Sequence, residues 1–162
     1  MNKTNELKKS AQAVQDVLEA HGLDCRVIEF PEGTRTSVDA ARAVGADLGQ
    51  IAKTLIFKTK KTDRPVLISA SGPNRVDERV SAREIGEKIT KADANFVKEV
   101  TGFAIGGVSP FATRQNIELV FVDKDLLQFD TVWVAAGTPN AVFEMKTSDL
   151  VSIIGGKIIS IV

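Results

Sequence analysis

The sequence is poor in the side chains that most enzymes use for acid–base and nucleophilic chemistry. Its 162 residues include one cysteine, one histidine and no tyrosine. Cys25 alone cannot form an intramolecular disulfide, and with His21 it makes neither a credible zinc ligand set nor a Cys/His or Ser/His/Asp triad. We therefore expect no metal and no other cofactor. Catalysis would have to rest on a lysine, backbone amides and a bound water.

Long apolar runs and an excess charge are also missing. No stretch is long enough to span a membrane, and the first residues lack the apolar core of a signal peptide. Lys plus Arg and Asp plus Glu number 21 each, so no overall field favours DNA or another polyanion. Glycine-rich nucleotide loops are absent as well. We expect a cytoplasmic protein whose contacts with phosphates, if any, are local, through Lys58, Lys60, Lys61, Arg64, Lys88, Lys91 and Lys98.

The length and the 43% hydrophobic content suit one well-packed domain, which we expect over residues 1–162. Apolar periodicity and capping signals predict helices over 5–21, 38–44, 82–89, 94–101 and 147–154. Apolar runs between turn residues predict strands over 25–30, 51–57, 66–70, 117–122, 131–136, 141–145 and 157–162. The third helix rests on a capping box of Ser81 and Glu84. Short turns between the strands over 117–145 predict antiparallel neighbours there, in an α+β fold.

The most informative stretch is Ile51-Ala52-Lys53-Thr54-Leu55-Ile56-Phe57. The alternation of a strand places Lys53 on one face with apolar residues. One interpretation is a lysine that snorkels from its apolar neighbours into water. The other is a site lysine, because partial desolvation strengthens the pull of an ammonium on an anion or a polarised carbonyl. The isolation of Lys53, in contrast to the charged turn that follows, favours the site.

A second informative stretch runs from Gly102 to Phe111 and contains Gly106-Gly107-Val108-Ser109-Pro110. Paired glycines let the backbone approach a ligand and point amides at it, and Ser109 adds a hydroxyl. A Gly-Gly pair by itself is equally typical of an ordinary tight loop. His21, at the end of the first predicted helix, is interpreted as structural, and Trp133 as part of the core.

Taken together, several ordered motifs resemble the YbaK/ProX family of trans-editing aminoacyl-tRNA deacylases. They are Thr36-x-x-Asp39-Ala40-Ala41 with Gly45, the Lys53 strand, Thr101-Gly102 with Gly106 to Phe111, Val122-Asp123 and Ala136-Gly137. The similarity extends over nearly the whole chain. The sequence is also similar to the editing insertion of bacterial prolyl-tRNA synthetases.

The resemblance implies a single domain with a mixed, mostly antiparallel sheet that curls into a barrel-like shape and is flanked by helices. It implies metal-independent hydrolysis of the ester between a small, wrongly attached amino acid and the 3′ acceptor end of tRNA. A partner would be an aminoacyl-tRNA synthetase such as prolyl-tRNA synthetase. The essential lysine of the family falls on Lys53. The implied substrate-binding residues are Phe30, Thr54, Gly106, Gly107, Val108, Ser109 and Gly137.

Three positions depart from the well-defined subgroups. Members that edit cysteine carry a serine and an aspartate where this chain has Ala135 and Val142, and members that edit alanine carry a histidine where it has Thr138. Two alternatives stay open at this point. The chain could be a non-catalytic module that binds the tRNA 3′ end or a synthetase, or an unrelated lysine-dependent enzyme that forms a Schiff base.

Overall fold

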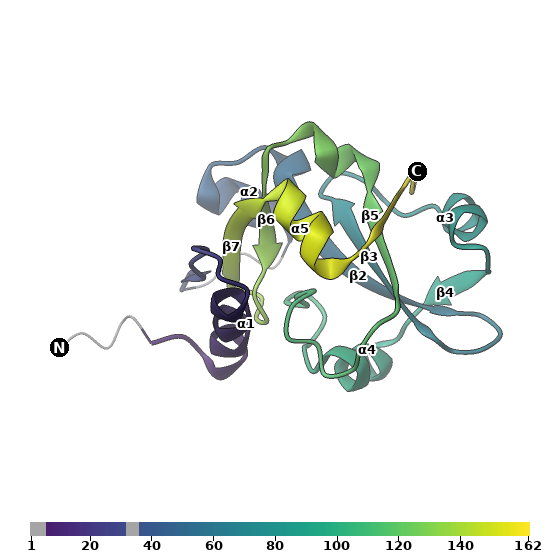
Figure 1. Cartoon of the computed structure of the whole chain (residues 1–162), viewed down its shortest axis with the longest axis horizontal. Helices are drawn as coiled ribbons and strands as arrows, with labels where there is room; N and C mark the ends of the chain where they lie inside the picture. The colour runs from purple at the N-terminus through teal and green to yellow at the C-terminus, as the bar shows by residue number, and fades with distance from the viewer. Residues whose placement is uncertain (1–5, 32–35) are drawn as a thin grey trace.

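A computed structural model describes residues 6–31 and 36–162. An eight-stranded mixed sheet forms the centre of the molecule, and it curls without closing (Figure 1). The strand order is β1-β7-β6-β2-β3-β5-β8, and β4 pairs with β2 beside this path. The strands are β1 (Ile28–Glu29), β2 (Ile51–Thr59), β3 (Pro65–Ser71), β4 (Ile89–Lys91), β5 (Leu119–Asp123), β6 (Thr131–Ala135), β7 (Ala141–Lys146) and β8 (Lys157–Ile159).

Helices flank this sheet, and most begin and end where the capping signals predict. The Thr36 hydroxyl accepts a hydrogen bond from the Asp39 N–H at 3.1 Å, and Gly45 ends the same helix in the left-handed conformation. Within the described residues the α-helices are α1 (Lys9–Ala20), α2 (Ser37–Val44), α3 (Glu78–Ile85), α4 (Ala94–Thr101) and α5 (Thr147–Ile154), and two 3₁₀ helices are η2 (Leu48–Gln50) and η3 (Lys124–Gln128). None of the helices described here is long and apolar enough to cross a membrane.

The predicted helix over 82–89 is wrong in position. Helix α3 begins earlier, because the Asp77 carboxylate accepts hydrogen bonds from the N–H groups of Arg79 and Val80. The helix ends at Gly86, and Ile89 already belongs to β4. Asp77 and Ser81, four residues apart, can both cap a helix. The sequence pattern favoured Ser81, whereas the helix begins after Asp77.

The predicted pairing of the later strands is only partly confirmed. β6 and β7 are antiparallel neighbours. β5 is not paired with β6, and lies parallel to both β3 and β8. The connection from β5 to β6 includes the helix η3, so it is longer than the short turn that we expected and does not force a hairpin.

The core is divided between the two faces of the sheet. Ala52, Ile56 and Leu67 belong to a large cluster that α1, α4 and α5 cover. Phe57 and Ile68 belong to a second cluster, to which Ile85 of α3 adds partly buried surface. Alternate residues of β2 and β3 therefore enter different clusters, as the period of two predicted.

Candidate functional site

The middle of β2 has an open edge. On one side β2 is paired with β3 from Ala52 to Lys58. On the other side it is paired with β6 only at Ile51 and Ala52, and with β4 only from Phe57 to Thr59. Among the described residues, 53–56 therefore have no strand partner on this second side.

The hydrogen bonds at the end of β2 show which groups point to the open edge. The Thr59 N–H donates to the Arg64 carbonyl on the β3 side at 2.9 Å, and the Lys60 N–H donates to the Lys88 carbonyl on the β4 side at 2.9 Å. Because neighbouring residues of a strand point their N–H and C=O groups to opposite sides, the groups of Thr54 and Ile56 point into the gap. A buried backbone N–H or C=O group normally has a hydrogen-bond partner. Because the groups of Thr54 and Ile56 have no strand partner on this side, they are available to water or to a ligand.

A cavity of about 510 Å³ lies along this open edge. Residues 51–57 line one side, with β6 and the loop after β4 at its two ends, and residues of α2 and of two loops complete it. Its size is in the range of pockets that hold a drug-sized ligand. Beyond β2 the lining residues are Thr36, Ser37, Ala40, Arg75, Val76, Glu78, Lys91, Ala92, Val97, Ile105, Gly106, Val108, Trp133, Ala135, Thr138, Pro139, Ala141 and Val142.

Lys53 is half-buried in the wall of this cavity. Its ammonium donates a hydrogen bond to the Gly72 carbonyl at 3.1 Å. Burial lowers the pKa of Lys53, the positive charge of Arg75 lowers it further, and Asp123 acts in the opposite direction. No carboxylate lies within ion-pair distance of Lys53 among the described residues, so its charge is available to a ligand.

The loop that carries Gly72 and Arg75 is held by the buried Asp123. One oxygen of the Asp123 carboxylate accepts from the Ser71 N–H at 3.0 Å and from the Asn74 amide at 2.8 Å. Gly72 itself is packed so closely against the Leu48 carbonyl oxygen that a Cβ would not fit there. These contacts fix the position of the carbonyl that accepts from Lys53.

The structure brings together some of the predicted site residues. Lys53, Thr54, Gly106 and Val108 all line the cavity. The Thr54 hydroxyl oxygen is buried and has no hydrogen-bond partner. The three positions that depart from the family subgroups, Ala135, Thr138 and Val142, line it as well.

The other predicted residues lie outside the lining. Phe30 is half-buried after β1, where its N–H donates to the Asn140 carbonyl at 2.8 Å. The fully buried Ser109 hydroxyl accepts from the Phe111 N–H at 3.2 Å, so it stabilises its own loop. Gly137 is buried, and a Cβ there would lie 2.9 Å from the Ser10 carbonyl oxygen of α1.

Gly107 joins two loops that both reach the cavity. A Cβ on Gly107 would lie 2.5 Å from the carbonyl carbon of Thr138 and 2.9 Å from the Pro139 nitrogen. The loop after α4 can therefore rest on the β6–β7 turn only where residue 107 has no side chain.

Of the charged lining residues, Arg75 and Glu78 were not predicted at all, and Lys91 was predicted only as a possible local contact with phosphate. They come from the loop before α3, from the first turn of α3 and from β4, which are the elements that the sequence placed incorrectly or missed. No cluster of three or more His, Cys, Asp or Glu side chains that could hold a metal occurs among residues 6–31 and 36–162. His21 caps the end of α1 and is exposed. Trp133 is half-buried and lines the cavity, so it is not purely a core residue.

Comparisons with known proteins show the family to which this fold and sequence belong. The family model of the "Aminoacyl-tRNA editing domain" matches residues 31–153. The uncharacterized protein YwhH of Bacillus subtilis is 36% identical over 124 residues, which are 76% of this chain and 78% of YwhH. A crystal structure described as that "of a putative trans-editing enzyme for prolyl tRNA synthetase" is 39% identical, with a TM-score of 0.89 over 96% of this chain and 98% of the other. The hypothetical protein APE2540 is 30% identical, with a TM-score of 0.84 over 92% of this chain and 98% of its own. The chain therefore belongs to the aminoacyl-tRNA editing domain family.

Proposed function

We propose that this protein hydrolyses the ester bond of tRNA that carries a wrong, small and uncharged amino acid. The observation that carries the proposal is the half-buried ammonium of Lys53, which lies beside unpaired main-chain groups in one cavity. A cavity of about 510 Å³ has room for the aminoacyl group together with the terminal nucleoside. The chain as a whole, residues 1–162, would act as one catalytic domain in the cytoplasm, where charged tRNA is used.

In the reaction, a water oxygen adds to the ester carbonyl carbon, and the bond from that carbon to the ribose oxygen then breaks. The attacking water gives up one proton and the ribose oxygen takes up one, so the products are the free amino acid and tRNA with a free 3′ end. Negative charge develops on the carbonyl oxygen in the transition state. We assign its stabilisation to the Lys53 ammonium and to an N–H of the open β2 edge, which are donors already oriented in a partly desolvated site.

The same edge offers acceptors for the amino acid. The unpaired carbonyls of Thr54 and Ile56 can accept hydrogen bonds from the α-ammonium of the substrate. Gly106 and Val108 would contact the aminoacyl group from the opposite loop, whereas Gly107, Ser109 and Gly137 would act by holding the loops in place. Phe30 would contribute from outside the lining residues.

The preference for a small uncharged side chain follows from the departures noted above. Ala135 and Val142 offer neither a hydroxyl nor a carboxylate at the positions where the cysteine-editing pattern has both. A pocket lined in this way discriminates by size, which gives only about 10- to 200-fold for one methylene. A synthetase that presents the correct tRNA, such as prolyl-tRNA synthetase, would then add the identity of the tRNA.

A panel of charged tRNAs tests the proposal. The wild-type protein, with or without EDTA treatment, should release one small amino acid from its tRNA, and Lys53→Met should not. Binding of charged tRNA without release would instead support a non-catalytic binding module. Covalent trapping of Lys53 by borohydride with a carbonyl compound would support Schiff-base chemistry, because ester hydrolysis forms no such adduct.

A further inference from the structure

A second hollow adjoins the cavity, beside helix α3. It has a volume of about 800 Å³ and is more open than the cavity. Glu78 in the first turn of α3 lines both spaces, so the two meet there. The hollow is lined by Lys60, Glu78, Arg79, Ala82, Arg83, Gly86, Glu87, Lys88 and Ile89, of which four are cations and two are carboxylates.

The four cations of the hollow are unpaired. The described residues contain two ion pairs within 4 Å, Lys58–Asp63 at 3.7 Å and Arg64–Glu87 at 3.8 Å. Lys60, Arg79, Arg83 and Lys88 make neither an ion pair nor a side-chain hydrogen bond to any described residue.

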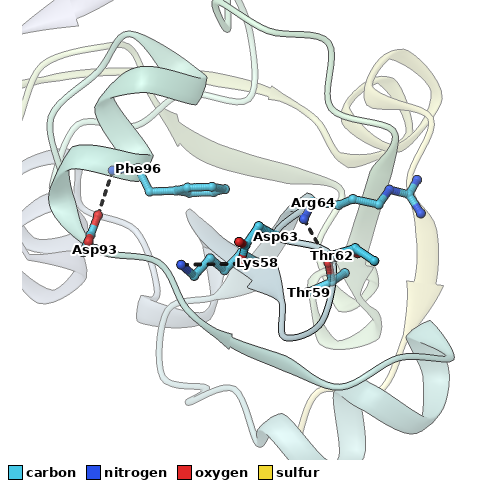
Figure 2. A network of polar contacts seen from close by, with 7 residues as sticks. All are labelled: Lys58, Thr59, Thr62, Asp63, Arg64, Asp93 and Phe96. Carbon is cyan, nitrogen blue, oxygen red and sulfur yellow. Dashed lines mark hydrogen bonds and ion pairs between the residues drawn. The ribbon is translucent and has the colours of Figure 1, made fainter.

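Lys58, in the neighbouring hairpin, shows the contrast. A dashed line in Figure 2 marks the ion pair between its ammonium and Asp63, and the Phe96 ring lies nearby. The ammonium lies 5.5 Å from the centre of that ring, which is within cation–π distance. Lys58 therefore interacts with Asp63 and Phe96 within the protein, whereas the cations of the hollow have no such partner.

The hollow also lies in a basic part of a neutral chain. Residues 58–91 contain nine of the 21 Lys and Arg residues and five of the 21 Asp and Glu residues. This segment therefore carries a net charge of +4, and the rest of the chain carries −4. A local excess of this kind attracts an anionic ligand even where the net charge is zero.

We infer that the hollow binds the phosphodiester backbone of the single-stranded 3′ end of tRNA while the aminoacyl ester occupies the cavity. This inference rests on the proposed function. Arg79 and Arg83 are four residues apart on α3, so they lie on one face, about 5–6 Å apart at their Cβ atoms. Their guanidinium groups can each hold a phosphate by two parallel hydrogen bonds, and Lys60, just after β2, and Lys88, just before β4, add point charges. Arg75 and Lys91 line the cavity and continue the positive path to Lys53.

The double variant Arg79→Gln/Arg83→Gln tests the site. Its control is the double variant Lys9→Gln/Arg26→Gln, which changes the net charge equally. Lys9 is the first residue of α1, which lies at the opposite side of the molecule from α3 in Figure 1. Each variant is assayed with a full charged tRNA and with the same amino acid esterified to adenosine, which has no phosphodiester. We expect the first variant to raise KM for the tRNA roughly 5- to 30-fold and to leave hydrolysis of the adenosine ester unchanged. The control should change neither.

A salt titration of binding to uncharged tRNA provides a second measurement. Removing two phosphate contacts should reduce the slope of log affinity against log salt by about 1.4, since each contact with a single strand contributes about 0.7. An unchanged slope, or an equal loss with the adenosine ester, would overturn the inference. If the wild-type protein hydrolyses neither substrate, the proposed function fails, and the slope still decides whether the hollow binds the tRNA backbone.

Discussion

The cavity beside β2 and the hollow beside α3 share Glu78, but they hold their cations in opposite ways. In the cavity, Lys53 is half-buried, donates to one carbonyl and has a lowered pKa. In the hollow, the two arginines of α3 and the lysines beside them are exposed and unpaired. Partial desolvation suits a cation that must act strongly on one developing charge, while exposure suits cations that attract a flexible, highly charged chain.

This difference in exposure predicts that the cavity mainly determines the reaction rate and that the hollow mainly determines the affinity for tRNA. Interactions with a partly desolvated charge are strong and are screened little by salt, whereas interactions between exposed charges are weak and are screened at physiological ionic strength. Changes in the cavity should therefore lower kcat with little dependence on salt. Changes in the hollow should alter KM, and that change should shrink as salt is added.

The largest expected effect is that of Lys53→Met. We expect a loss of about 100- to 1,000-fold in kcat, because one oriented donor to the oxyanion is removed. Stability should stay the same or rise, since the variant buries a methionine in place of a partly desolvated charge. Parallel losses of activity and of melting temperature would instead indicate a lysine that only packs.

The pH dependence of the same pair of proteins gives an independent check. Because the pKa of Lys53 is lowered in the folded protein, its ammonium form is lost at a lower pH than for an ordinary lysine. Activity that needs the ammonium should therefore decline in that earlier alkaline range. Between the lowered and the ordinary pKa, Lys53 is protonated in the unfolded chain but not in the folded protein. The free energy of unfolding of the wild type should therefore increase with rising pH in that window, relative to Lys53→Met.

The sequence was most successful where one signal determined one element. The strand around Lys53 and the helices over 38–44 and 94–101 all lie within two residues of their predicted bounds. It was least successful at contacts between distant segments. The parallel pairing of β2 with β6, and the open edge that this short pairing leaves, come from residues about 80 positions apart and have no local pattern.

The same limit applies to the candidate site. Lys53 stood out because it interrupts an apolar strand, but Arg75 and Glu78 look like ordinary surface charges in the sequence. Both line the cavity and lie beside Asp77, which starts α3 earlier than the Ser81 signal suggested. The packing of Gly107 on Thr138 was also invisible, since the two residues belong to different loops.

A smaller effect is expected for Gly107→Ala, which forces the two loops of the cavity apart. Its Cβ would meet backbone atoms, which cannot rotate away, so stability should fall by about 1–3 kcal/mol. Displacement of the cavity wall should lower kcat/KM by up to about 100-fold. Gly155→Ala is the control, because it strains a left-handed residue at the end of α5 where a Cβ meets no atom within 4 Å. Equal kcat/KM in the two variants would show that the contact does not shape the site.

Thr54→Pro tests the open edge with a smaller expected effect. It removes the N–H that points into the gap and no hydrogen bond to β3, so the fold should survive. The Ile56 N–H still points into the gap and can hold the oxyanion, so losing one of the two main-chain donors should lower kcat/KM by only about 2- to 13-fold, corresponding to about 0.5–1.5 kcal/mol. Leu55→Pro should instead be clearly destabilising, because it breaks the ladder with β3.

Thr54→Val separates the N–H of this residue from its side chain. The Thr54 hydroxyl is buried without a partner, so its removal should leave stability unchanged or slightly higher. We expect kcat/KM of this variant to stay near the wild-type value. A loss equal to that of Thr54→Pro would assign the effect to the hydroxyl and not to the open edge.

The smallest expected effect is that of Glu78→Gln, at the point where the two spaces meet. A carboxylate here repels a phosphate that passes from the cavity to the hollow, so removing its charge should strengthen tRNA binding by about 1.4- to 5-fold at low salt. The same charge lies in the first turn of α3, where it stabilises the helix, so the melting temperature should fall slightly while affinity rises. Glu84→Gln changes the same charge on the same helix but lines neither space, and should leave tRNA affinity nearly unchanged. Equal gains in the two variants would mean that only the overall charge of α3 matters, and a loss of affinity in Glu78→Gln would mean that no phosphate passes this residue.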